Sequence, residues 1–185
     1  MDDIKSEILN KLKSVSAPPF LFVGSGITQR YIGAPTWEGL LEHFAKLSSD
    51  SDFAYQMYRG KAIRSEYTNG IEPKIAELIE ADFNDKWYTS SGYKESRMKY
   101  ADIASNGCSP LKIEIADLFK EISSKPFREG IDIEVKHLEE VADKSIAGII
   151  TTNYDCIIER IFSKYKYSKY VGQEELLFQP ITGIS

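Results

Sequence analysis

Ser145-Ile-Ala-Gly-Ile-Ile-Thr-Thr-Asn-Tyr-Asp-Cys-Ile-Ile-Glu159 is the stretch that decides the fold. It opens with a short apolar run, Ile146 to Ile150, which is typical of a buried strand. The polar residues Thr151 to Asp155 follow, and apolar residues then recur at helical spacing. In open α/β sheets, ligands bind beyond the carboxyl ends of the strands. The order of strand, polar turn and helix therefore predicts a ligand-binding sheet edge.

A second strand and turn lie near the start of the chain. Pro19-Phe-Leu-Phe-Val23 is typical of a buried strand, and Gly24-Ser-Gly-Ile-Thr28 follows at once. Glycines at a strand end permit a tight turn and let a phosphate approach backbone N–H groups. Two glycines also occur in turns that bind nothing. The dinucleotide fingerprint needs a further glycine where this chain has Gln29, which argues against an ordinary Rossmann dehydrogenase.

The two strands predict an α/β protein that is mostly helical by residue count. We expect strands 20–23 and 146–150 to be parallel and to lie in one sheet, with Gly24 and Asn153 at the same sheet edge. A helical block of roughly 100 residues lies between the strands, far more than the dozen that a crossover needs. We therefore expect a partial Rossmann-like parallel sheet in a single domain, 1–185, with a large helical insertion over about 48–144.

Local signals place several further elements. Thr36 is a plausible cap before an apolar stripe, and Pro110 suits the first position of another helix. The polar stretch 84–93, with its scattered aromatic residues, predicts a loop. A helix over 3–15 and a short strand near 167–171 are predicted towards the two ends of the chain.

Three motifs together resemble a known family. They are Gly24-Ser-Gly-Ile-Thr28, Gly33-Ala-Pro-Thr-Trp-Glu-Gly-Leu-Leu41 and Ile150-Thr-Thr-Asn-Tyr-Asp155. The set is similar to the sirtuin-like domain of bacterial NAD-consuming proteins, many of which serve in anti-phage defence. Ser25 and Thr28 depart mildly from the family's Gly-Ala-Gly-hydrophobic-Ser motif. The resemblance spans roughly 18–179 and implies an enzyme that takes NAD as substrate and cleaves its nicotinamide–ribose bond.

The resemblance also implies residue roles. Asn153 would be catalytic, holding a ribose hydroxyl or orienting water, and Asp155 would contact the carboxamide or support Asn153. The remaining NAD contacts would come from Gly24, Ser25, Gly26, Thr28, Pro35, Thr36, Trp37 and Thr152. Structural readings stay open beside these roles: Asn153 can shape a turn and Asp155 can cap a helix. Thr152 can be a strand residue, and Trp37 can pack in the core.

The family's catalytic histidine has no counterpart after Asn153, because no histidine follows that residue. We therefore expect a C-terminally incomplete domain that hydrolyses NAD poorly or not at all. His43 and His137 fall outside the apolar stripes, so we expect both on helix surfaces. Two alternatives remain: a non-catalytic nucleotide-binding sensor or assembly module, and a protein deacylase.

Bulk properties exclude several classes of protein. The net charge of −5 gives no electrostatic footprint for nucleic acid. No apolar run approaches the about 20 residues of a membrane span, and no cluster of residues has metal-ligand spacing. The two cysteines, Cys108 and Cys156, form no disulfide framework and are expected to be small, at least half-buried hydrophobes. We expect a cytoplasmic protein that has NAD as its ligand. We also expect it to form a homo-oligomer or to bind a partner defence protein.

Overall fold

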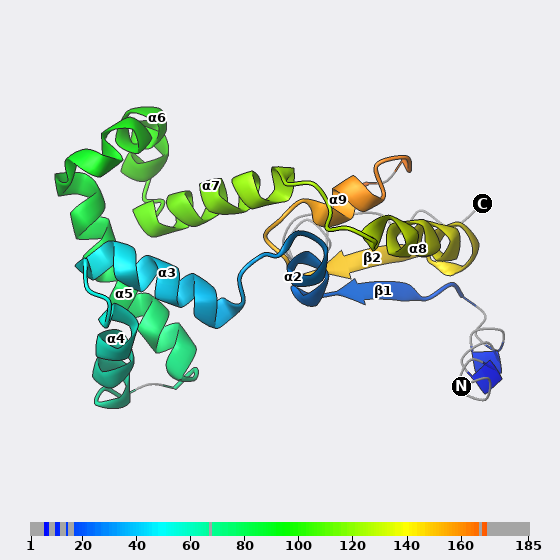
Figure 1. Cartoon of the computed structure of the whole chain (residues 1–185), viewed down its shortest axis with the longest axis horizontal. Helices are drawn as coiled ribbons and strands as arrows, with labels where there is room; N and C mark the ends of the chain where they lie inside the picture. The colour runs from blue at the N-terminus through cyan, green and yellow to red at the C-terminus, as the bar shows by residue number, and fades with distance from the viewer. Residues whose placement is uncertain are drawn as a thin grey trace.

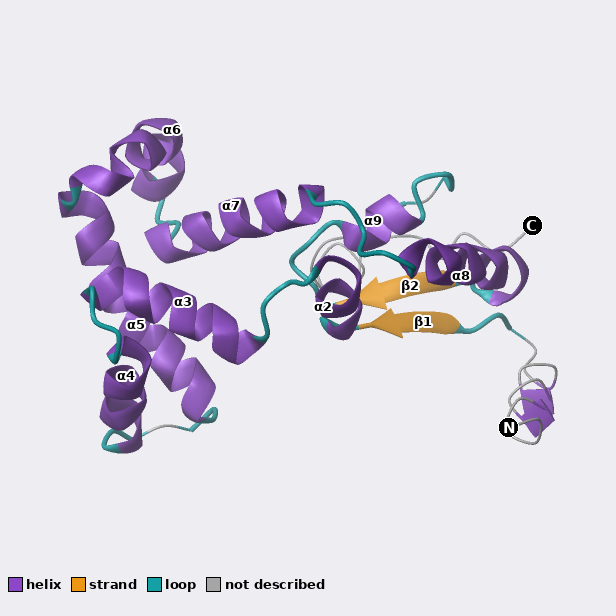
Figure 2. Ribbon diagram, viewed as in Figure 1, coloured by secondary structure: helices purple, strands orange, loops and turns teal. Residues whose placement is uncertain are grey.

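The computed structural model describes residues 6–7, 10–11, 14, 17–66, 68–166 and 168–169. Within these ranges the protein is α/β, mostly helical, with one two-stranded parallel sheet (Figure 2). The predicted helix over 3–15 and the predicted strand near 167–171 lie largely outside the described residues. No described helix is both long and apolar enough to cross a membrane.

The two predicted strands lie in one sheet, as expected, and pair directly with each other. Strand β1 (Phe20–Val23) and strand β2 (Gly148–Thr151) run parallel, in a register that joins Phe20 to Gly148 and Val23 to Thr151. Their predicted parallel direction within one sheet is confirmed, although β2 begins later and ends one residue later than expected. Because the strands are parallel and in this register, the turns that follow them lie at the same edge of the sheet (Figure 1).

One face of this sheet packs against helices and forms the sheet core. The helices are α2 (Gly26–Ile32), α8 (Ile131–Ser145) and α9 (Ile157–Ile161). Val23 and Ile157 are buried in this core, with Leu21 and Ile149 packed against it. Side chains alternate across a strand, so Phe22 and Ile150 point to the opposite face and remain exposed. The packed face fixes where the strand ends lie.

The remaining helices form a separate helical core. It contains α3 (Trp37–Ser49), α4 (Ala54–Ile63), α5 (Ile71–Thr89), the short 3₁₀ turn η1 (Ser91–Tyr93) and α6 (Lys94–Ser105). Helix α5 runs through its centre, because Ile75, Ile79, Phe83 and Trp87 recur every four residues and are fully buried. The loop predicted over 84–93 is therefore wrong as far as Thr89: the polar residues there are the outer face of α5.

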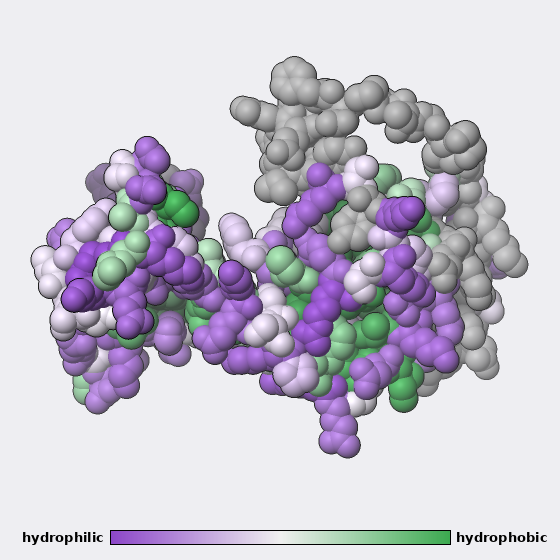
Figure 3. Space-filling model, turned by 90° about the horizontal axis from the view of Figure 1, so that it is seen from above, coloured by the Kyte–Doolittle hydropathy of each residue, from purple (hydrophilic) through white to green (hydrophobic). Residues whose placement is uncertain are grey.

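Helix α7 (Pro110–Ser124) joins the two cores, since Leu111 belongs to the helical core and Ile122 to the sheet core. The second connection is the linker 33–36 between α2 and α3. The space-filling view shows the two lobes with a narrower waist between them (Figure 3). The helical lobe is thus inserted between α2 and α8, and the strand ends belong wholly to the sheet lobe.

Candidate functional site

The candidate site begins where the two strands end. The Gly24–Gly26 turn leads from β1 into α2, and residues 152–156 lead from β2 into α9. The backbone N–H of Asn153 donates to Thr151 Oγ1 at 3.1 Å, which bends the second turn. The Asn153 side chain then reaches across the edge, and its Nδ2 donates to the main-chain oxygen of Gly24 at 3.2 Å. The two predicted ligand turns are therefore in direct contact.

Thr28 lies beneath this contact and is only 1% exposed. Its hydroxyl donates to Asp155 Oδ2 at 2.7 Å and accepts from Asn153 Nδ2 at 3.1 Å. The other oxygen of Asp155 accepts from the backbone N–H of Ile157 at 3.0 Å. Cys156, not Asp155, occupies the N-cap position of α9, so the capping prediction is wrong by one residue. The Asp155 carboxylate nevertheless accepts from the first backbone N–H of the helix and also from Thr28.

The hydrogen-bond order fixes which atom Asn153 presents. A carboxylate and a carbonyl oxygen only accept, so Thr28 must give its proton to Asp155, and the Asn153 atom that contacts Gly24 must be the NH₂ group. Both protons of that group are used, on Gly24 and on Thr28. The amide oxygen Oδ1 has no partner in the described part of the chain. Asn153 can therefore receive a hydrogen bond from a ligand but cannot donate one with its side chain.

Gly24 and Gly26 leave open space at the same edge. Neither has a left-handed backbone conformation, and a Cβ built at either position has no described atom within 4 Å. Neither backbone strain nor packing against described residues therefore requires glycine here. Small residues at this turn keep the backbone N–H groups accessible, which is what an approaching phosphate needs.

The structure places the other predicted ligand residues on the surface. Ser25 is exposed and accepts from the Gln29 side chain, and Thr152 is exposed beside Asn153. Thr36 caps α3 by accepting from the backbone N–H of Gly39 at 3.1 Å, as predicted. Trp37 is 51% exposed, so the interpretation as a core residue is wrong.

Pro35 is partly buried in the linker before α3. Among the described residues, no hydrogen bond links the 35–37 segment to the edge formed by Gly24 and Asn153, so the structure does not join that part of the predicted ligand site to the strand ends.

Neither histidine belongs to the edge. His43 on α3 and His137 on α8 are both exposed, as predicted. Cys108 is partly buried, but Cys156 is exposed, so the expected burial of Cys156 is wrong. Its position before α9 holds it at the surface, where its backbone N–H donates to Ser123 Oγ. Among the described residues, no group of three His, Cys, Asp or Glu side chains is arranged to hold a metal ion.

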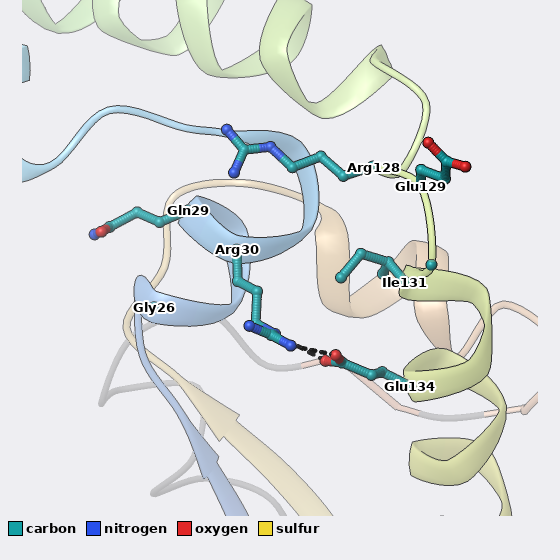
Figure 4. Close-up of a pocket in the computed structure, with 8 residues that line it drawn as sticks. Gly26, Gln29, Arg30, Arg128, Glu129, Ile131 and Glu134 are labelled. Atoms are coloured by element: carbon teal, nitrogen blue, oxygen red, sulfur yellow. Dashed lines mark hydrogen bonds and ion pairs between the residues drawn. The ribbon is translucent and has the colours of Figure 1, made fainter.

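A surface hollow of about 580 Å³ lies between α2 and the start of α8 (Figure 4). Gly26, Gln29 and Arg30 line it from α2, a face nearly opposite Thr28 at helical spacing. Arg30 forms a two-bond ion pair with Glu134 of α8, and these hydrogen bonds hold the pKa of Glu134 below its ordinary value. The hollow is lined by charged side chains of both signs. The ion pair between Arg30 and Glu134 joins α2 to α8.

The sequence alone does not predict the ion pair between Arg30 and Glu134. Arg30 and Glu134 are 104 positions apart, so no local pattern connects them. The same holds for Arg128, whose backbone N–H donates to the Tyr31 carbonyl at 2.8 Å and whose side chain lies against Gly33.

Comparison with known proteins adds no relative: no protein-family model, no curated protein and no solved structure matches the chain. The resemblance to the sirtuin-like domain therefore rests on the three motifs alone. Two of these motifs meet at the sheet edge, through the contact between Gly24 and Asn153.

Proposed function

We propose that the edge formed by Gly24 and Asn153 binds NAD, in a sirtuin-like, Rossmann-like domain whose parent protein hydrolyses the nicotinamide–ribose bond in anti-phage defence. The observation that carries the proposal is the hydrogen bond from Asn153 Nδ2 to the Gly24 oxygen. It joins a glycine turn suited to phosphate and a polar turn suited to ribose at the carboxyl ends of parallel strands, where α/β sheets bind ligands.

Each part of the edge has a distinct task in this proposal. The backbone at Gly24, Ser25 and Gly26 faces the pyrophosphate, since no described side chain fills the space beside the two glycines. Asn153 Oδ1 accepts a hydrogen bond from a ribose hydroxyl or from the attacking water. Cleavage of the nicotinamide–ribose bond proceeds through an oxocarbenium-like centre, so an acceptor that orients water favours hydrolysis.

A non-catalytic nucleotide sensor is the second candidate, and one observation favours it. Hydrolysis of NAD calls for a general base, and both histidines of this chain are exposed on α3 and α8 and take no part in the hydrogen bonds of the edge. An enzyme and a sensor share the same binding step. Binding of NAD, rather than its turnover, is therefore the property that this chain must have under either proposal.

Calorimetric titration with NAD and ADP-ribose tests the proposal. Gly24→Val adds a branched side chain at a position where a Cβ has no described atom within 4 Å, so the fold should tolerate it while the ligand should not. Gly60→Val is the matched control, because the same change falls on α4 in the helical lobe.

We expect saturable binding by the wild type and by Gly60→Val, and at least tenfold weaker binding by Gly24→Val. Absence of saturable binding of both nucleotides to the folded wild type would contradict the proposal. So would unchanged affinity in Gly24→Val.

A further inference from the structure

We infer that Thr28 is a positioning residue, which sets the orientation of the Asn153 amide and does not itself touch the ligand. The expected effect of Thr28 on NAD affinity rests on the proposed nucleotide site. The role of Thr28 in orienting the Asn153 amide does not depend on that site. Thr28 is 1% exposed and is the one buried polar residue in the described part of the chain. A hydroxyl at that depth, with both of its hydrogen bonds made inside the protein, is not accessible to a phosphate.

Thr28 occupies an unusual position for a helical threonine. A threonine hydroxyl in a helix often bonds to the carbonyl four residues earlier, which here belongs to Gly24. That carbonyl instead accepts from Asn153, and the Thr28 proton goes to Asp155. The side chain of Asn153 therefore lies between the Gly24 oxygen and the Thr28 oxygen, and both oxygens accept from its NH₂ group.

This arrangement selects one of the two amide orientations. A flipped amide would place Oδ1 against two oxygens, Gly24 O and Thr28 Oγ1, and Thr28 could not relieve this without giving up its bond to Asp155. Thr28 thus keeps Oδ1 free of the protein. A site with Oδ1 free takes a ligand hydroxyl or a water, both of which donate.

Thr28→Val tests the inference, since valine keeps the shape and removes the hydroxyl. Thr28→Ser restores the hydroxyl and serves as the rescue variant. The first readout needs no ligand: NMR of the Asn153 side-chain amide. We expect both NH₂ protons of the wild type and Thr28→Ser to exchange slowly, and those of Thr28→Val to exchange faster at a shifted frequency.

The second readout is affinity for NAD. We expect Thr28→Val to bind about tenfold more weakly than wild type, the size of one lost hydrogen bond, and Thr28→Ser to bind within about threefold. A purely structural threonine would lower the unfolding free energy of Thr28→Val without moving the affinity of its folded fraction.

The outcomes distinguish a failure of the proposed NAD site from a failure of the positioning role of Thr28. If the wild type binds no NAD, the proposed function fails, while the NMR comparison still decides the role of Thr28. Asn153 amide protons that exchange freely in the wild type overturn the inference, even if Thr28→Val does not fold. Unchanged Asn153 resonances in a folded Thr28→Val overturn it as well.

Discussion

Asn153 and Gly24 are 129 positions apart in the chain, yet the side-chain amide of one lies 3.2 Å from the main-chain oxygen of the other. This contact exists because β1 and β2 are parallel neighbours whose carboxyl ends share an edge. It makes Asn153 both a part of the fold and a candidate ligand contact. The two roles require separate measurements.

Asn153→Ala should lower the free energy of unfolding by about 1–3 kcal/mol, because it removes the two side-chain hydrogen bonds that join Asn153 to Gly24 and Thr28. Urea denaturation measures the change. Tyr154→Ala is the control: its side chain is 82% exposed, and we expect a change within about 0.5 kcal/mol. Equal stability losses in the two variants would show that the contact does not hold the edge together.

Gly33→Ala should destabilise the protein for two separable reasons. Gly33 has a φ of 71°, a left-handed conformation that costs a non-glycine residue roughly 1–2 kcal/mol. A Cβ there would also collide with the Arg128 guanidinium. In an Arg128→Ala background, Gly33→Ala should lower the unfolding free energy only by the cost of the left-handed backbone conformation.

Thermal unfolding of the Gly33 and Arg128 single variants and of the double variant measures this. Gly60→Ala in α4 is the control, and we expect it to be neutral or stabilising, since alanine favours a helix interior over glycine. A Gly33→Ala protein as stable as the wild type would contradict the structure of the α2 end.

The ion pair between Arg30 and Glu134 should give the stability a specific pH dependence. Hydrogen bonds from Arg30 lower the pKa of Glu134 below its ordinary value of 4.5 in the folded protein. A lowered carboxyl pKa stabilises the folded state fully above pH 4.5, and this contribution is lost as the pH falls through the lowered pKa. Both side chains are well exposed, so the effect should be small.

Melting temperatures of the wild type and Glu134→Gln test this dependence. We expect the wild type to melt higher at about pH 7 and the difference to shrink as the pH falls below 4.5. Lys74→Gln supplies a control ion-pair deletion on α5, remote from α2 and α8. If the difference in melting temperature between the wild type and Glu134→Gln grows as the pH falls, its pH dependence has the wrong sign. That result would contradict a Glu134 pKa lowered by Arg30.

Much of the sheet and its edge could be predicted because their signals are local. The apolar runs before Gly24 and Thr152 mark strand ends, and glycine and asparagine mark turns within a few residues. Thr36 and Pro110 mark helix starts in the same way, and both helices begin where predicted.

Other features depend on contacts between distant residues. The α2 helix has only seven residues, and Ser25 before it makes no side-chain capping bond, so its start carries no local signal. The last turns of α5 look polar in sequence, and only the burial of Trp87 shows that the helix continues there. Likewise, the composition of the Gly24–Thr28 motif does not distinguish the buried Thr28 from the exposed Ser25.

The most direct test of the proposed site is an NMR titration of the folded 185-residue chain with NAD. We expect the largest chemical-shift changes at the backbone amides of Gly24 and Ser25 and at the side-chain amide of Asn153. We expect much smaller changes at Arg128 and Glu134, which line the hollow on the other side of α2. Shifts concentrated in that hollow, or no saturable shifts at all, would contradict a nucleotide site at the strand ends.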